Sequence, residues 1–189
     1  AGAEFVFRLY LEGGFEAVNR AFQNPPQSTE QVLHPDRYLA GDPPRATPPP
    51  DVEAALGLGW MRADEGVLGE LLTGVHLGAF LPGERAKEAA AGWGGDRYAL
   101  LKDPGGKDLF VLVTLWDTPG DAAQFFMAYL NLVDAKSLGE WDLVLETDSA
   151  RHWVGDGISV YLELDGDKTT LAIGPDRDSV DAILGAGGA

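Results

Sequence analysis

The chain has 189 residues, which suits one large or two small domains with a core of useful size. Its formal net charge of -16 at pH 7 repels phosphate backbones and anionic lipids, and therefore argues against nucleic acid as a partner. Cysteine is absent, which excludes disulfides and thiol catalysis, and no apolar run reaches the ~18 residues that a transmembrane helix needs.

The beginning of the chain has the pattern of helices. Apolar residues recur at helical spacing over residues 3–23, with a break at Gly13-Gly14. A capping box follows, in which the Ser28 hydroxyl would bond the free amides of a new helix while Gln31 reaches back to it. We expect this helix to be short, because Pro35 disfavours helical geometry at the residue before it.

A proline-rich stretch separates the chain into two parts. Residues 41–51 hold five prolines, which is typical of an extended, semi-rigid connector. We therefore predict a helical subregion with this connector over residues 1–50, and an α+β domain over residues 51–189.

The domain is predicted to begin with a helix over residues 63–80, whose apolar face is formed by Val67, Leu71 and Val75. A short helix follows Pro82. The pattern then changes to strands over residues 98–101, 109–116, 141–145, 158–164 and 169–173. Further helices are predicted over residues 119–135 and 177–184, the second beginning after Asp176 and ending at Gly185.

One short motif occurs twice in the domain. Trp93-Gly94-Gly95-Asp96 and Trp153-Val154-Gly155-Asp156 are sixty residues apart by subtraction, and each precedes strand, turn, strand and helix patterns. This spacing predicts an internal pseudo-repeat of about 92–136 and 152–185. Neither unit buries its sheet face alone. We therefore predict an α+β fold: a helical N-terminal part, then two tandem strand–strand–helix units that form an antiparallel sheet with helices packed on one face.

Histidines are the first candidates for a functional site. Glu30 and His34 have the i, i+4 spacing of two metal ligands on a helix, but a closed site needs further ligands. The remaining histidines lack a partner at ligand spacing. We interpret His76 as a partly buried residue with one hydrogen bond, and His152 as a surface or turn residue.

Aspartates and tryptophans are the other candidates. Five aspartates lie close together near the C-terminus, but without the spacing of a calcium-binding loop, so a weak cation site stays open as an alternative to turn and helix-start roles: Asp165, Asp167, Asp176, Asp178 and Asp181. The Trp–Asp pairs of the repeated motif either mark ligand sites or, as we prefer, close the core and bond nearby amides. Phosphate-loop and nucleophile-elbow motifs are missing. The sequence therefore predicts no catalytic, cofactor-binding or metal-binding residue.

Several segments resemble a family of bacterial and archaeal envelope proteins: Leu-Tyr-Leu-Glu-Gly-Gly-Phe at 9–15, Ala-Val-Asn at 17–19, Pro-Pro-Gln-Ser-Thr-Glu-Gln-Val-Leu-His-Pro at 25–35, Gly-Trp-Gly-Gly-Asp-Arg-Tyr at 92–98 and Trp-Asp-Thr at 116–118. In that family, this region follows a helical part with the His-Glu-x-x-His segment of zinc metallopeptidases. That segment does not occur in this chain. The resemblance implies an extracytoplasmic location, in the cell envelope or secreted, and a chain equivalent to the C-terminal region of such a protein or to a homologue without its metal site.

Three functions remain open from the sequence. The preferred one is a non-enzymatic, extracytoplasmic accessory or interaction domain whose partner is another protein of the envelope. The first alternative is the C-terminal portion of a secreted zinc metallopeptidase-like protein whose metal site lies upstream. The second is a binder of a small apolar ligand, with a cavity between sheet and helices, which the aromatic content suggests.

Overall fold

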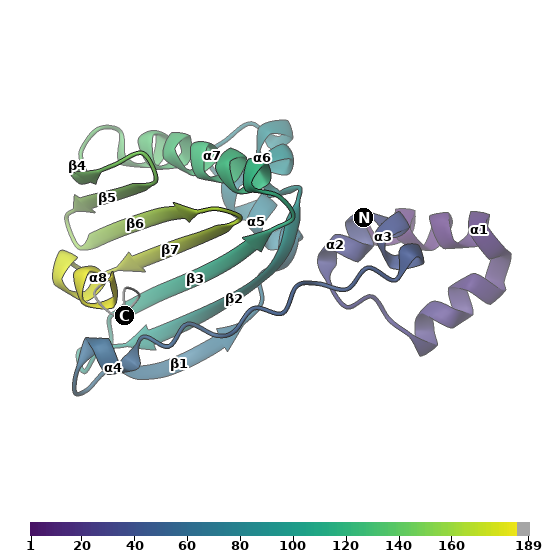
Figure 1. The fold of residues 1–189 in the computed structure, drawn as a ribbon, viewed down its shortest axis with the longest axis horizontal. Helices are drawn as coiled ribbons and strands as arrows, with labels where there is room; N and C mark the ends of the chain where they lie inside the picture. The colour runs from purple at the N-terminus through teal and green to yellow at the C-terminus, as the bar shows by residue number, and fades with distance from the viewer. Residues whose placement is uncertain (185–189) are drawn as a thin grey trace.

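The structure is a computed structural model of the chain and describes residues 1–184. A seven-stranded antiparallel sheet forms its centre, and the N-terminal helices project from one end of the sheet (Figure 1). This arrangement confirms the predicted α+β class. Among residues 1–184, none of the helices combines the length and apolar character needed to cross a bilayer.

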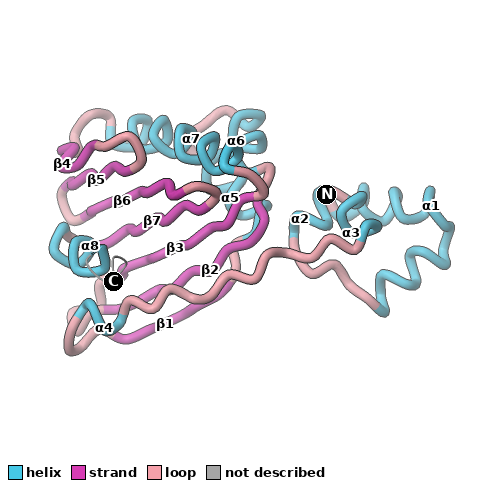
Figure 2. Tube along the Cα trace, in the orientation of Figure 1, coloured by secondary structure: helices cyan, strands magenta, loops and turns pink. Residues whose placement is uncertain are grey.

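The helices and strands alternate irregularly along the chain (Figure 2). The helices are α1 (Gly2–Gln23), α2 (Thr29–Leu33), α3 (Pro35–Ala40), α4 (Glu53–Leu56), α5 (Gly69–Gly78), α6 (Gly83–Ala90), α7 (Pro119–Ser137) and α8 (Arg177–Leu184). The strands are β1 (Met61–Gly66), β2 (Trp93–Lys102), β3 (Asp108–Trp116), β4 (Asp142–Glu146), β5 (Ala150–Gly155), β6 (Ile158–Asp165) and β7 (Lys168–Gly174). Their order in the sheet is β1-β2-β3-β7-β6-β5-β4.

The N-terminal helices follow the predicted signals. Helix α1 is interrupted by non-helical backbone at Gly13 and Gly14. The Ser28 hydroxyl accepts a hydrogen bond from the Gln31 amide at 3.2 Å, as expected of a capping box. The Gln31 side chain reaches back one residue further than predicted, to the amide of Gln27 at 2.7 Å.

The prediction of a helix over residues 63–80 is wrong for its first part. Strand β1 occupies Met61–Gly66 and pairs with β2, for example Glu65 with Ala99. Helix α5 begins only at Gly69, whose φ of +73° favours glycine. Pairing with a neighbouring strand has overridden the local helical periodicity, because strand formation depends mainly on its partners in the sheet.

The sheet is covered on both faces. On one face, Leu112 and Trp116 pack with α5, α6 and α7. Leu109 and Val111 alternate with them along β3 and point to the opposite face, where α8 and Val52 cover part of the sheet. The helix predicted over residues 119–135 is α7, and it buries an apolar stripe along its length: Ala122, Phe125, Phe126, Tyr129, Leu132 and Val133. The predicted packing of helices on one face of the sheet therefore holds for α5, α6 and α7, whereas α8 packs on the opposite face.

The two predicted repeat units have the same order of strands and helix, but the Trp–Asp motif lies at a different place in each. The units β2–β3–α7 and β6–β7–α8 are joined by antiparallel pairing of β3 with β7. Trp93 opens β2, whereas Trp153 lies near the end of β5, a strand that the sequence did not predict. The helices α7 and α8 also cover opposite faces. Gly185, the expected end of the second unit, lies outside the described residues, and the division near residue 50 stays a prediction.

The repeated glycine of the motif permits a close approach in each copy. The amide of Arg45 donates to the carbonyl of Gly94 at 2.6 Å, so the connector lies against the start of β2. A Cβ atom on Gly95 would lie 2.2 Å from the Arg45 carbonyl oxygen. A Cβ atom on Gly155 would lie 2.5 Å from the ring of Trp141. The motif therefore marks places where another part of the chain packs on bare backbone.

Gly95→Ala is expected to lower the free energy of unfolding by about 1–3 kcal/mol, because the clash is with backbone and no side-chain rotation relieves it. Urea unfolding measures the change. Gly83→Ala is the control, since nothing lies within 4 Å of its added Cβ. Equal effects of the two substitutions would show that the connector does not pack on Gly95.

Candidate functional site

The main candidate site is a groove between α5, α6 and the end of α2, which we call the α5–α6 groove. Its volume is about 540 Å³. Its lining is almost entirely apolar and includes Leu33, Leu71, Val75, Ala86 and Ala90. Leu71 and Val75 belong to the face that the sequence assigned to a core, yet they are 42% and 62% exposed. Helix α5 instead turns Gly69, Glu70, Thr73 and Leu77 inward.

Small residues form the floor of the groove. A Cβ atom on Gly74 would lie 3.6 Å from Ala90 Cβ, and one on Gly78 would lie 3.7 Å from Ala86 Cβ. Helices α5 and α6 therefore approach each other closely, with little side-chain bulk between them. Such a floor leaves room for the side chains of a further helix to enter.

One end of the groove carries a buried carboxylate. Glu70 is 5% exposed, and its Oε1 is 2.8 Å from His34 Nε2. Within residues 1–184, Glu70 Oε2 has no hydrogen-bond partner. Burial raises the pKa of Glu70, and the contact with His34 opposes that rise. The groove is thus apolar, and the carboxylate at one end of it has one oxygen that is buried without a partner within residues 1–184.

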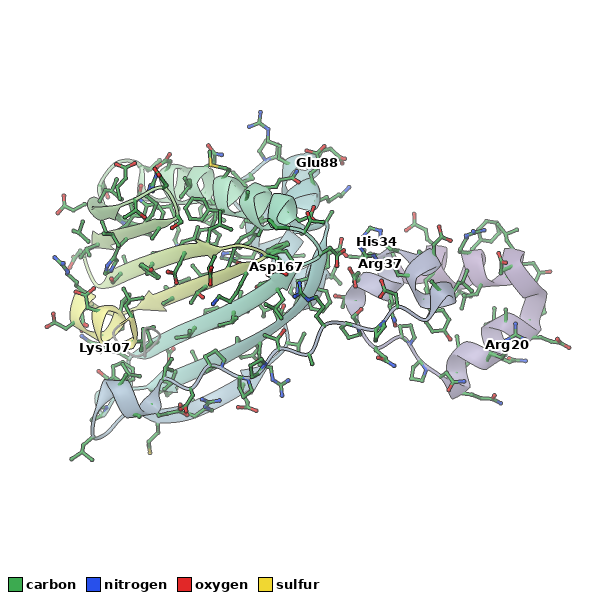
Figure 3. The ribbon with its side chains drawn as sticks, viewed as in Figure 1. Arg20, His34, Arg37, Glu88, Lys107 and Asp167 are labelled. Atoms are coloured by element: carbon green, nitrogen blue, oxygen red, sulfur yellow. The ribbon has the colours of Figure 1, made fainter. Side chains whose placement is uncertain are left out.

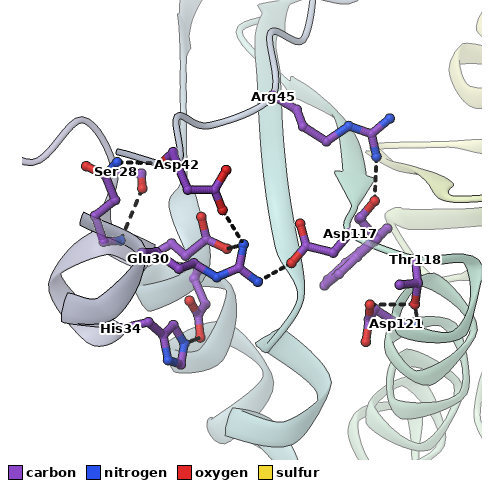
Figure 4. Close-up of polar contacts among 12 residues, drawn as sticks. Ser28, Glu30, His34, Asp42, Arg45, Asp117, Thr118 and Asp121 are labelled. Carbon is purple, nitrogen blue, oxygen red and sulfur yellow. Dashed lines mark hydrogen bonds and ion pairs between the residues drawn. The ribbon is translucent and has the colours of Figure 1, made fainter. Parts of the chain in front are cut away.

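An ionic cluster beside the groove joins the N-terminal helices to the domain. Figure 3 shows His34 and Arg37 where these helices face the sheet, and Figure 4 shows their contacts. Arg37 contacts Glu30 at 3.1 Å and Asp42 at 3.2 Å, and it also pairs with Asp117 at the start of α7. Burial raises the pKa of Glu30 to about 7, although Arg37 lowers it. Asp117 raises this pKa further, with smaller contributions from Glu70 and Asp42.

The structure separates the two residues that had metal-ligand spacing. Glu30 pairs with Arg37, whereas His34 pairs with Glu70. Across residues 1–184, no group of three or more His, Cys, Asp or Glu side chains is placed to hold a metal ion.

The C-terminal aspartates have individual roles. Asp165 pairs with Lys168 at 3.1 Å, and Asp167 pairs with Arg45 at 2.7 Å. Asp176 Oδ1 accepts from the amide of Ser179 at 2.9 Å, which is the predicted helix-start role. Each of these three aspartates therefore has a different partner within the protein.

The remaining histidines differ in environment. His152 was predicted at the surface, and this is wrong: it is 2% exposed and lies 2.7 Å from the Ser159 hydroxyl in the sheet. The alternation of β5 points this side chain inward, and the strand itself was not foreseen. His76 forms the predicted hydrogen bond, with Nε2 3.3 Å from the Tyr129 hydroxyl, but its side chain is exposed rather than partly buried.

A second cavity lies between α5 and the sheet, and we call it the α5–sheet cavity. Its volume is about 320 Å³. Its lining comes from α5, β3, α7 and β7: Leu68, Leu72, Thr73, His76, Phe110, Leu112, Phe125, Tyr129, Leu171 and Ile173. A cavity of this kind is what the apolar-ligand alternative required.

Asp96 holds the start of α5 in place. Its carboxylate accepts hydrogen bonds from Trp93 Nε1 at 2.8 Å and from the amides of Gly69 and Leu68 at 2.8 Å and 2.9 Å. This is the structural role preferred from the sequence, although the amides come from a distant segment. Asp156, its counterpart in the second motif, is exposed.

Sequence reasoning missed Glu70 and the outward face of α5. The apolar periodicity of Val67, Leu71 and Val75 was visible, but periodicity identifies an apolar face without identifying what covers it. Glu70 belonged to none of the residue groups that were considered as candidates, and no sequence pattern pointed to it. Its burial in the structure is what distinguishes it.

Comparisons with known proteins give one family and one solved structure. The profile of a family described as "Domain of unknown function (DUF8575)" matches residues 57–184, so α1 to α4 lie outside the match. The crystal structure of the extracellular domain of PknH from Mycobacterium tuberculosis is similar at 11% identity and a TM-score of 0.45, over 72% of this chain and 89% of that one. A search of curated proteins finds no match.

Proposed function

We propose that this chain, which belongs to the DUF8575 family, is a non-enzymatic interaction domain that holds another protein of the cell envelope in the α5–α6 groove. The observation that carries the proposal is the outward face of α5, where Leu71 and Val75 stand exposed beside a groove of about 540 Å³. Contiguous apolar surface of this kind is typical of protein interaction sites.

The chemistry of the groove specifies the partner. An apolar channel floored by small residues suits an amphipathic helix laid between α5 and α6. The net charge of -16 favours a helix that carries basic residues. We therefore assign the groove to a basic amphipathic helix of a partner protein.

The extracytoplasmic location is part of the proposal and is supported by the sequence resemblance to envelope proteins. The same resemblance supports the alternative in which this chain is the C-terminal portion of a zinc metallopeptidase-like protein with its metal site upstream. The upstream reading frame tests that alternative, since a His-Glu-x-x-His segment there would replace our proposal.

Val75→Asp is expected to weaken binding of a synthetic Leu/Lys amphipathic helix by at least tenfold, as measured by fluorescence anisotropy. Met127→Asp is the matched control, because Met127 is 57% exposed on a helix outside the groove. Non-specific attraction between the acidic protein and a basic peptide would grow with either added aspartate. Weaker binding to Val75→Asp alone therefore supports the groove. Equal changes in both variants would contradict it.

Sedimentation of the chain alone tests whether a second copy of the chain occupies the α5–α6 groove. We expect the chain to remain a monomer at the concentrations used for peptide binding. A dimer that Val75→Asp dissociates would assign the groove to a second copy and overturn the choice of a different partner.

A second candidate function, binding of a small apolar ligand, is favoured by the α5–sheet cavity. Its volume of about 320 Å³ falls at the lower end of the roughly 300–1,000 Å³ of small-molecule sites. The cavity is separate from the groove, because the two share none of their lining residues. Both functions can therefore be present in one chain.

A further inference from the structure

We infer that the ligand of the α5–sheet cavity is a single-chain amphiphile with a carboxylate head, such as a medium-chain fatty acid. The tail would lie among the apolar side chains of β3, β7 and α7, and the head would lie beside His76, Tyr129 and Lys136. This inference rests on the second candidate function and adds the chemical class of its ligand.

The body of the cavity selects an apolar chain. Phe110, Leu112, Leu171 and Ile173 of the sheet form one wall, and Phe125 of α7 closes it on another side. The modest volume of about 320 Å³ suits one narrow tail better than a polycyclic molecule.

The polar side chains of the cavity lining supply a hydrogen-bond donor. His76 is exposed, and its ring stacks on that of Tyr129, with ring centroids 5.7 Å apart. The Tyr129 hydroxyl is buried, and its one hydrogen-bond partner within residues 1–184 is His76. The phenol and the imidazole bond each other, so one donor of the pair, either an N–H or an O–H, remains for a carboxylate.

A positive charge lies just beyond the cavity lining, on the same helix as Tyr129. Lys136 Nζ lies 5.9 Å from the ring centroid of Phe80 and 5.7 Å from that of Trp141. Phe80 lies just after α5 and four residues after His76, so the two are neighbours on one side of that helix. Lys136 lies seven residues after Tyr129 on α7, so these two also share a helical face.

This lysine is available to a ligand. Within residues 1–184, Lys136 forms no ion pair, although the chain holds 30 acidic residues. Burial and then the charge of Lys136 lower the pKa of His76. The surroundings of His76 are therefore locally positive on a strongly acidic protein, which favours an anionic head.

Titration calorimetry of the whole chain with decanoate and with decanol, each below its micellar concentration, tests the inference. We expect decanoate to bind more tightly than decanol, and Lys136→Gln to weaken decanoate about tenfold while leaving decanol unchanged. Lys102→Gln is the control for the loss of one positive charge, because Lys102 pairs with Asp108 and neither residue lines the cavity.

Two results would overturn the inference, and they are distinguishable. If decanoate and decanol bind equally and Lys136→Gln changes neither affinity, the assignment of a carboxylate head is wrong, but the cavity still binds an apolar ligand. Binding of neither probe would remove both the head assignment and the second candidate function. The groove proposal is tested separately by the Leu/Lys peptide, so it does not depend on either result.

Discussion

Asp96→Ala is expected to lower the free energy of unfolding by roughly 3 kcal/mol, the largest effect on stability that we expect from one substitution. The carboxylate is 3% exposed and accepts from Trp93 Nε1 and from the amides of Leu68 and Gly69. Removing it leaves three donors without their acceptor, in surroundings that water barely reaches. Burial of an unsatisfied donor costs about 1–3 kcal/mol, and the three costs are not additive.

Asp156→Ala is the matched control for this experiment. Asp156 holds the same position in the second Trp–Asp motif, but its side chain is exposed. We expect a change within about 0.5 kcal/mol for it, as for most surface substitutions. Urea unfolding of both variants measures the difference. Similar losses for both would mean that Asp96 does not secure α5.

Glu30→Gln is expected to stabilise the protein by about 2 kcal/mol at pH 8, and by much less at pH 4. The pKa of Glu30 is raised from 4.5 to about 7, mainly by burial, so the folded chain holds this proton more tightly than the unfolded chain. Its contribution to stability is therefore present below pH 4.5 and is lost as the pH rises through 7. The substituted amide would stay neutral throughout, while Arg37 keeps its contacts with Asp42 and Asp117.

Thermal unfolding between pH 4 and pH 8 measures this difference. Glu16→Gln, on an exposed part of α1, controls for the removal of one negative charge. A stability difference between wild type and Glu30→Gln that does not change with pH would contradict the account. So would destabilisation at pH 8, which would show that the Glu30–Arg37 pair outweighs the burial of the carboxylate.

Local signals predicted much of the fold. Helix α7 was predicted over residues 119–135 and runs over Pro119–Ser137, with Thr118 as its cap. The hairpin of β6 and β7 follows from two apolar strands around Gly166, whose φ is +61°. In these segments, local preference and tertiary packing agree.

Other segments were decided by contacts that a sequence does not display. Strand β1 exists because β2 offers a free edge, and β5 places His152 in the core by alternation. The sequence predicted that the Asp96 carboxylate accepts hydrogen bonds from backbone amides. It did not predict that one of these amides belongs to Gly69, which is 27 residues away. The placement of α8 on the second face likewise depends on which side of β7 the chain crosses.

The candidate site was predictable only in part. The apolar face of α5 was evident, and its assignment to the core was the natural prediction for a chain considered alone. The structure shows that the core is filled by other residues and that Val67, Leu71 and Val75 are exposed. The cavity beneath α5 agrees with the apolar-ligand alternative, but its lining joins four elements that no local pattern connects.

Photo-crosslinking in the native envelope tests the central claim most directly. A benzophenone side chain in place of Val75 lies beside the α5–α6 groove, and one in place of Met127 lies on α7 outside it. We expect one discrete product from position 75 and none from position 127, with the crosslinked peptide belonging to a basic amphipathic helix of a different protein. An absence of product at position 75, or the same products at both positions, would contradict the account.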